Sequence, residues 1–223
     1  MSRLKVGVLV SGRGSNMEAL AEACGADDHP AEISVVVSNR PNAAGLERAA
    51  SFGIATEVVD HTAFADKAAF EAEVIRVLEE YGVELICLAG FMRVLSEDFV
   101  ARFPHKILNI HPSLLPAFPG LHVQRKAIEY GVRFSGCTVH FVVSEVDAGP
   151  IVLQAVVPIE QDDTEGTLAA RILEQEHRIY PEAVQLFAQG RLRIDDRRVL
   201  IAGEREGRRP TEGREPGVEE LND

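Results

Sequence analysis

The chain contains 223 residues, 46% of them hydrophobic, which is enough for one domain with a substantial core. Its formal net charge of −12 argues against nucleic-acid partners, because a basic surface supplies most of the affinity for phosphate backbones. No apolar run is long enough to cross a bilayer, and the run at 6–10 is too short for a signal peptide, so we expect a cytoplasmic protein without membrane contacts. The three cysteines lie far apart without a CxxC pair, which argues against a disulfide framework and a zinc ribbon.

Short apolar runs and helical patterns alternate along the first half of the chain. The runs predict buried strands at 6–10, 33–37, 56–59, 85–89 and 107–110, and the patterns between them predict helices at 17–24, 44–51 and 67–81. None of these strands alternates polar with apolar residues, as expected for strands that are covered on both faces. The pattern predicts the α/β class, with a doubly wound, mostly parallel, Rossmann-like sheet.

The pattern changes after Ser135. Two closely spaced strands are predicted at 137–143 and 151–157, followed by a long helix at 164–188 and a small hairpin or strand pair within 191–201. This portion is expected to be antiparallel, so that 1–202 form one domain. Beyond Ala202 the chain is rich in Gly, Arg and Glu, and we predict a disordered tail at 203–223, since few large apolar side chains are present to offset the ordering entropy.

A glycine-rich loop at 12–16 follows the first predicted strand and precedes a helix. At such a position the N-terminal amides of the helix point at a bound anion, and Ser15 can cap the helix and donate its hydroxyl to a phosphate. Met17 stands where the dinucleotide-binding pattern requires a third glycine, and the Gly-Lys-Ser/Thr ending of a triphosphate loop is absent. The loop therefore favours a monophosphate site, with a purely structural turn as the alternative.

Asn109 and His111 stand two residues apart at the end of a predicted strand, so their side chains project to the same side. Ligands bind at this carboxyl edge of an α/β sheet. An N–H from Asn109 and one from a charged His111 are suitable donors to the oxyanion that forms when an amine attacks a formamide carbon. Asp147, in an Asp-Ala-Gly-Pro turn, can supply the carboxylate that favours the charged imidazole. The three residues predict acyl transfer between amines, without a protein nucleophile.

Other interpretations of these residues stay open at this point. A histidine after a strand is more often a structural hydrogen-bonding residue than a catalyst. The histidines at 105, 111, 122, 140 and 177 show no HExxH or other compact ligand spacing, so no metal site is expected. A Ser–His triad lacks support, because the chain contains no Gly-x-Ser-x-Gly elbow.

Several sequence blocks in a fixed order carry a resemblance to a known family. The blocks are 10–16, 88–95, 109–116, 119–122, and 138–142 through 147–150. On these blocks the chain resembles the phosphoribosylglycinamide formyltransferases of purine biosynthesis over roughly residues 4–200. The resemblance implies a formyltransferase fold and transfer of the formyl group of 10-formyltetrahydrofolate, a co-substrate, to the amine of 5-phosphoribosylglycinamide. It implies no metal and only small-molecule substrates as partners, and it leaves a homodimer open.

The resemblance also implies roles for individual residues. Asn109, His111 and Asp147 match the catalytic trio of the family, and the loop leading to Asp147 matches one that closes over the pterin. The residues that match the phosphate and ribotide site are Gly14, Ser15, Asn16 and Glu176. Those that match the folate site are Met92, Arg93, Val94, Leu95 and Asn109, together with Lys67, which stands where relatives often carry an arginine near the folate tail.

Three other functions compete with this one. A formyltetrahydrofolate hydrolase is similar in its catalytic half, but it carries an extra N-terminal regulatory domain and lacks the Gly-x-Gly-Ser-Asn loop. A methionyl-tRNA formyltransferase would need an added RNA-binding domain and a basic surface. A non-catalytic folate- or phosphate-binding module would not need Asn109, His111 and Asp147 together, so their joint presence favours the transferase.

Overall fold

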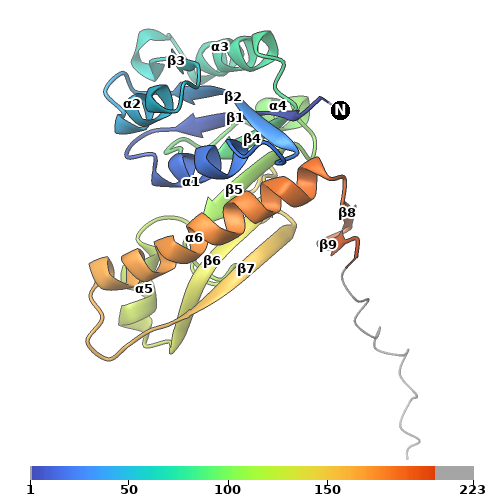
Figure 1. Cartoon of the computed structure of the whole chain (residues 1–223). Coiled ribbons are helices and arrows are strands. Elements are labelled where there is room, and N and C mark those ends of the chain that lie inside the picture. Colours follow the sequence, from blue (N-terminus) through green and yellow to red (C-terminus); the bar gives the residue numbers. More distant parts are fainter. Residues whose placement is uncertain (1, 204–223) are drawn as a thin grey trace, which may run out of the picture.

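The computed structural model describes residues 2–203 of the chain (Figure 1). The strands are β1 Leu4–Val10, β2 Ala31–Ser38, β3 Thr56–Val58, β4 Leu85–Leu88, β5 Ile107–His111, β6 Phe134–Phe141, β7 Ile151–Pro158, β8 Leu192–Asp195 and β9 Arg198–Ile201. The helices are α1 Ser15–Cys24, α2 Ala44–Ser51, the short 3₁₀ helix η1 His61–Ala63, α3 Lys67–Glu80, α4 Glu97–Arg102, α5 Val123–Tyr130 and α6 Glu165–Ala188. Apart from Gly203, the predicted tail lies outside the described residues.

The strands of the described region form one sheet in the order β3-β2-β1-β4-β5-β6-β7-β9-β8. Strands β3, β2, β1, β4 and β5 are parallel, whereas β6 runs antiparallel to both β5 and β7. The predicted strand pair within 191–201 is the antiparallel hairpin β8–β9, which joins the sheet beside β7. The predicted doubly wound, mostly parallel sheet with an antiparallel C-terminal portion is confirmed.

Apolar layers cover both faces of the sheet, as strands without polar alternation require. On one face, Val8 and Val10 of β1 pack with Met17 of α1 and Ile172 of α6, two helices that lie side by side (Figure 1). On the other face, Leu9 packs against buried side chains of α3 and α4. Each fully buried Val or Leu side chain contributes roughly 1.5–3 kcal/mol, so this packing fixes the strand ends that carry the loops of the site.

The loops after β1, β4 and β5 meet at one edge of the sheet. From β1 the chain continues to β2 and β3 on one side, whereas β4 leads to β5 on the other. Because β1 and β4 are neighbours, the crossover direction reverses between them. In open α/β sheets a crevice forms at such a switch point, outside the carboxyl ends of the strands. The glycine-rich loop and the Asn109–His111 segment therefore lie at the same edge.

Two short helices are not predicted by the apolar patterns. Helix α4 has only six residues and begins after Ser96, whose hydroxyl oxygen accepts the N–H of Phe99 at 3.1 Å. Helix α5 buries only Val123 and Ala127, so its apolar stripe is too narrow to stand out in the sequence. Both lie in connections next to the candidate site, and neither changes the predicted order of the strands.

The start of α1 differs from the prediction. The helix begins at Ser15, and Gly14 occupies the N-cap position without any side-chain cap, so the predicted capping role of Ser15 is wrong. Gly14 has a φ of 76°, and a Cβ there would lie 2.6 Å from the Cα of Gly45 in α2, so glycine alone permits this close approach. The first backbone N–H groups of α1 have no partner within the helix and stay available to an anion.

Candidate active site

Strand β5 carries Asn109 and His111 to the carboxyl edge of the sheet, where both side chains line one cavity of about 460 Å³. The strand is held in place because Ile107, Leu108 and Ile110 are buried in the apolar layers. Side chains two residues apart on a strand project the same way, which places the carboxamide and the imidazole side by side on the cavity wall.

Asp147 reaches the same cavity from the turn between β6 and β7. Its Oδ2 lies 3.5 Å from Nδ1 of His111 and accepts the N–H of Gly120 at 2.8 Å. The turn is tight: a Cβ on Gly149 would lie 1.8 Å from the carbonyl oxygen of Phe141, so only glycine fits there. Asp147 itself has a φ of 55°, a left-handed conformation that aspartate tolerates better than most residues. The turn thus holds a carboxylate beside the imidazole.

His140 joins these residues and is absent from the set that the sequence predicts. In the antiparallel β5–β6 pair it stands opposite Asn109, whose Nδ2 lies 3.1 Å from Nε2 of His140. The same Nε2 is 3.7 Å from Oδ1 of Asp147. The sequence feature that could have identified His140 is its place in the 138–142 block. Its position opposite Asn109 depends on the register between β5 and β6, which the sequence does not specify.

Backbone carbonyls determine which ring nitrogens carry protons. Nδ1 of His140 lies 2.9 Å from the carbonyl oxygen of Phe141, and Nε2 of His111 lies 3.0 Å from that of Phe118. A carbonyl oxygen only accepts, so these two nitrogens are donors. In neutral His140 the Nε2 is therefore the acceptor, and it accepts an N–H of Asn109.

The electrostatic surroundings keep His140 neutral. Burial lowers the pKa of His140 below its ordinary value of 6.5, and the neighbouring His111 acts in the same direction. The bond to the Phe141 carbonyl and the negative charge of Asp147 oppose this shift without overcoming it. Near pH 7 the imidazole of His140 is thus an uncharged acceptor that orients the Asn109 carboxamide.

The segment 90–95 forms another wall of the 460 Å³ cavity. Met92 and Val94 present their side chains to it with exposed fractions of 61% and 59%, whereas Leu95 is buried. Large apolar side chains exposed side by side are unusual on a surface that binds nothing. The cavity thus combines an apolar wall with the polar groups of Asn109, His111 and Asp147, which is typical of small-molecule sites.

The two predicted cationic residues of the folate site are placed differently. Arg93 lines the cavity, and its guanidinium carbon lies 5.2 Å from the ring centroid of Phe70 in a cation–π contact. Lys67 does not line the cavity; its Nζ lies at the start of α3, 3.8 Å from Oε1 of the buried Glu71. Only Arg93 of this pair is therefore in position to contact a ligand inside the cavity.

Asn16 and Glu176 meet where α1 lies beside α6. Nδ2 of Asn16 donates to Oε2 of Glu176 at 2.6 Å. Burial raises the pKa of the Glu176 carboxyl above its ordinary value of 4.5, and the bond from Asn16 partly opposes this shift. Oδ1 of Asn16 is buried without a hydrogen-bond partner within residues 2–203, which leaves a buried acceptor for a ligand hydroxyl. Gly14, Ser15 and Asn16 do not line the 460 Å³ cavity, so the glycine loop begins beyond its edge.

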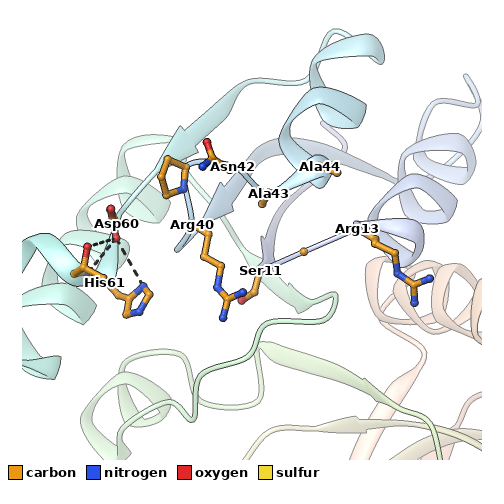
Figure 2. A pocket seen from close by; sticks show the side chains of 11 residues that line it. Ser11, Arg13, Arg40, Asn42, Ala43, Ala44, Asp60 and His61 are labelled. Atoms are coloured by element: carbon orange, nitrogen blue, oxygen red, sulfur yellow. Dashed lines mark hydrogen bonds and ion pairs between the residues drawn. The ribbon is translucent and has the colours of Figure 1, made fainter.

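A second hollow, of about 570 Å³, lies beside the start of the glycine loop (Figure 2). It is lined by residues 11–13, 40–44 and 60–62. In Figure 2 the side chain of Arg40 extends into the space between His61 and Ser11, and Arg13 extends away from it. These guanidinium groups place positive charge near the loop in a chain whose net charge is −12, which favours the approach of an anionic group.

Neither metal ligation nor a membrane span is found in the described part of the chain. Within residues 2–203, no group of three or more His, Cys, Asp or Glu side chains is arranged to hold a metal ion. None of the helices in that range combines the length and the apolar character that a bilayer crossing requires.

Comparison with known proteins identifies the family. Residues 4–184 match the family described as formyl transferase. The chain is 43% identical to phosphoribosylglycinamide formyltransferase of Escherichia coli K12 over 202 residues, which cover 91% of this chain and 95% of that protein. It is 50% identical over 195 residues to the trifunctional purine biosynthetic protein adenosine-3 of Gallus gallus. That match covers 87% of this chain but only 19% of the length of the trifunctional protein.

A solved structure shows the same relationship. Glycinamide ribonucleotide transformylase 1 from Symbiobacterium toebii is similar to this chain with a TM-score of 0.87 and 51% sequence identity. The likeness covers 89% of this chain and 94% of that one. The extent of the family match and the identity to the Escherichia coli protein agree with the family that the sequence blocks predict. The chain therefore belongs to the phosphoribosylglycinamide formyltransferase family.

Proposed function

We propose that this chain transfers the formyl group of 10-formyltetrahydrofolate to the amine of 5-phosphoribosylglycinamide, giving the N-formyl product and tetrahydrofolate. The observation that carries the proposal is the meeting of Asn109, His111 and Asp147 on the wall of one cavity. The ribotide amine is itself the nucleophile. Its nitrogen bonds to the formyl carbon, the bond from that carbon to N10 of the folate breaks, the amine loses one proton and N10 gains one.

Asn109 is proposed as the first donor to the oxyanion of the tetrahedral intermediate. Its amide nitrogen carries two hydrogens, of which the bond to His140 uses one. The second is directed by that bond and is free to reach the oxygen that becomes negative. A donor that is already oriented before the reaction stabilises the developing charge without reorganisation, and removing one such donor typically lowers the rate about 100- to 1,000-fold.

His111 is proposed as the second donor, in its charged form. Its Nε2 already donates to the Phe118 carbonyl at 3.0 Å, whereas its Nδ1 faces Asp147 at 3.5 Å, which is longer than a good hydrogen bond. Nδ1 is thus the nitrogen with spare capacity, and its N–H can serve the reacting oxygen while Asp147 stabilises the positive charge. Asp147 also assists the transfer of a proton from the amine towards N10, through water.

The two substrates are proposed to occupy adjoining parts of the same edge of the sheet. The reduced folate lies in the 460 Å³ cavity against Met92, Val94 and Leu95, with Arg93 beside them. Lys67 stays a proposal for the folate tail, outside the lining of the cavity. The ribotide phosphate binds at the amides of Gly14, Ser15 and Asn16, where the start of α1 offers unpaired N–H groups, and Glu176 with Asn16 receives the ribose hydroxyls.

A turnover assay tests the proposed reaction against its competitors. Consumption of 10-formyltetrahydrofolate is followed with and without the ribotide. A transferase consumes the folate only when the ribotide is present. Consumption without the amine would indicate the hydrolase instead, since water would then replace the nucleophile. Binding of both ligands without turnover under either condition would indicate a non-catalytic module.

Three further expectations accompany the proposed reaction. The protein is proposed to be cytoplasmic. Its proposed substrates are small molecules, without nucleic-acid or membrane partners. Residues 1–202 are proposed to act as one formyltransferase domain. A homodimer stays a prediction that sedimentation equilibrium of the full chain would test.

A further inference from the structure

The hydroxyl of Ser11 connects the start of the glycine loop to the 90–95 wall of the 460 Å³ cavity. Ser11 is the first residue after β1, and the glycine loop follows it directly. Its Oγ donates to Oδ1 of Asn39 at 2.5 Å and accepts the backbone N–H of Met92 at 2.8 Å. One side chain therefore joins the loop after β1, the loop after β2 and the segment after β4.

Both side chains of this connection are sealed from water. Ser11 and Asn39 each have an exposed fraction of only 3%. A buried donor or acceptor without a partner destabilises the fold, because its lost hydration is not replaced. The Ser11 hydroxyl, the Asn39 carboxamide and the Met92 N–H therefore fix one another's positions. Asn39 is held in turn by His61 of η1, whose Nδ1 lies 3.3 Å from Nδ2 of Asn39 and 2.9 Å from its carbonyl oxygen, at the border of the hollow in Figure 2.

The segment that Ser11 holds has little other support for its backbone. Residues 90–95 belong to no helix or strand, and within residues 2–203 the N–H of Met92 makes the one hydrogen bond of their backbone. The other anchors are side-chain contacts, in which Phe91 packs against the core, Arg93 lies over Phe70 and Leu95 is buried. The next residue, Ser96, donates its backbone N–H to Oε1 of Glu71 at 2.9 Å. The position of Met92 and Val94 on the cavity wall thus depends on the Ser11 hydroxyl more than on any other polar contact.

We infer that Ser11 is a positioning residue for the folate side of the site: its hydroxyl, aimed by Asn39, fixes the 90–95 wall against the glycine loop. The inference rests on the proposed function, because it identifies a reduced folate as the ligand of that wall. Ser11 touches neither the reacting atoms nor the phosphate in this role. Its loss should weaken folate binding selectively, since the proposed ribotide contacts at Ser15, Asn16 and Glu176 do not involve the Met92 backbone.

The test compares Ser11→Ala with a matched control. Ser38→Ala also removes a fully buried serine hydroxyl at the end of a neighbouring strand, but within residues 2–203 that hydroxyl bonds only to the backbone of Arg40 in its own loop. Binding of a 5,8-dideazafolate, which carries no transferable formyl group, is measured by titration calorimetry, and ribotide binding is measured separately. For Ser11→Ala we expect roughly tenfold weaker folate binding with ribotide binding changed less than about twofold, and for Ser38→Ala neither change.

Kinetics and two further variants complete the test. Ser11→Ala should raise the KM for 10-formyltetrahydrofolate with kcat near the wild-type value, and Ser11→Thr, which keeps a hydroxyl, should restore much of the affinity. If Ser11→Ala does not fold, Asn39→Ala removes the acceptor that aims the hydroxyl and should weaken folate binding roughly threefold.

Wild-type folate affinity in the folded variants would overturn the inference, and so would an equal loss for folate and ribotide, which indicates general damage. These outcomes leave the proposed function intact, provided that the wild-type chain binds folate and turns over. A wild-type chain that binds no reduced folate would overturn the proposed function and this inference together.

Discussion

Asn109 and His140 face each other across the β5–β6 pair, and the carboxamide of Asn109 donates to Nε2 of His140 at 3.1 Å. This bond exists only if Nδ1 of His140 carries the proton, which its contact with the Phe141 carbonyl requires. It settles which end of the carboxamide is nitrogen and which hydrogen points into the cavity. His140, which has no proposed contact with the reacting atoms, thereby orients Asn109, which is proposed to donate to the oxyanion.

Replacing His140 should therefore lower turnover without weakening substrate binding. In His140→Ala the Asn109 carboxamide loses its buried partner and can rotate, so we expect kcat to fall about tenfold, which corresponds to roughly 1.4 kcal/mol of lost transition-state stabilisation. His140→Gln keeps an acceptor oxygen at a similar reach and should recover part of the loss. Steady-state kinetics checks this, with His29→Ala, at the opposite edge of the sheet before β2, as the control. An unchanged kcat in His140→Ala would remove the orienting role.

The lowered pKa of His140 should also appear in the stability of the protein. In the unfolded chain this histidine binds a proton near pH 6.5, whereas burial lowers the pKa in the folded chain and keeps the ring neutral. The unfolding free energy should therefore fall as pH drops below 6.5 towards the folded pKa, by at most about 1.4 kcal/mol per pH unit from this group. His140→Gln lacks that contribution, so its stability difference from wild type should narrow between pH 7.5 and pH 5. Urea unfolding over this range measures it, and a constant difference would contradict the shift.

The two proposed oxyanion donors have a common kinetic signature. Asn109→Ala and His111→Ala should each lower turnover about 100- to 1,000-fold, because each removes a preoriented donor, while ribotide affinity survives. Single-turnover rates and equilibrium titration with the ribotide separate these two effects. Near-wild-type turnover in either folded variant would reject its assignment as a donor.

The phosphate contact at the start of α1 is tested by a double comparison. Ser15→Ala should weaken ribotide binding roughly three- to tenfold, because one hydroxyl contact to the phosphate is lost while the backbone amides remain. The dephosphorylated riboside should bind far more weakly to the wild type, and Ser15→Ala should then make no further difference. Equal effects of the substitution on both ligands would show that Ser15 does not act on the phosphate.

Local patterns in the sequence predict most of the fold. The uninterrupted apolar strands predict a parallel sheet covered on both faces, and the closely spaced strands after Ser135 predict its antiparallel portion. The short helices α4 and α5 escape prediction because six to eight residues with one or two buried positions give almost no periodic signal. Ser15 is a favourable cap by residue type, but the close packing of Gly14 on Gly45 sets the start of α1 two residues earlier than predicted.

The site is predictable only where its residues are close in sequence or belong to the recognised blocks. Asn109 and His111 follow from strand periodicity, and the structure brings Asp147 to them. His140 and Ser11 act through pairing between strands and between loops that are far apart in the chain, and no spacing rule specifies such contacts. Lys67 shows the opposite case, since its match to the position where relatives often carry an arginine does not place it on the cavity wall.

The fate of the formyl carbon distinguishes transfer to the ribotide from hydrolysis. The full chain is incubated with 10-formyltetrahydrofolate labelled with ¹³C in the formyl group and with 5-phosphoribosylglycinamide, and the label is followed by NMR. We predict that the label moves to the amine nitrogen of the ribotide, and that Asn109→Ala and His111→Ala slow this transfer about 100- to 1,000-fold. Label released as free formate, at the same rate with or without the ribotide, would contradict this prediction.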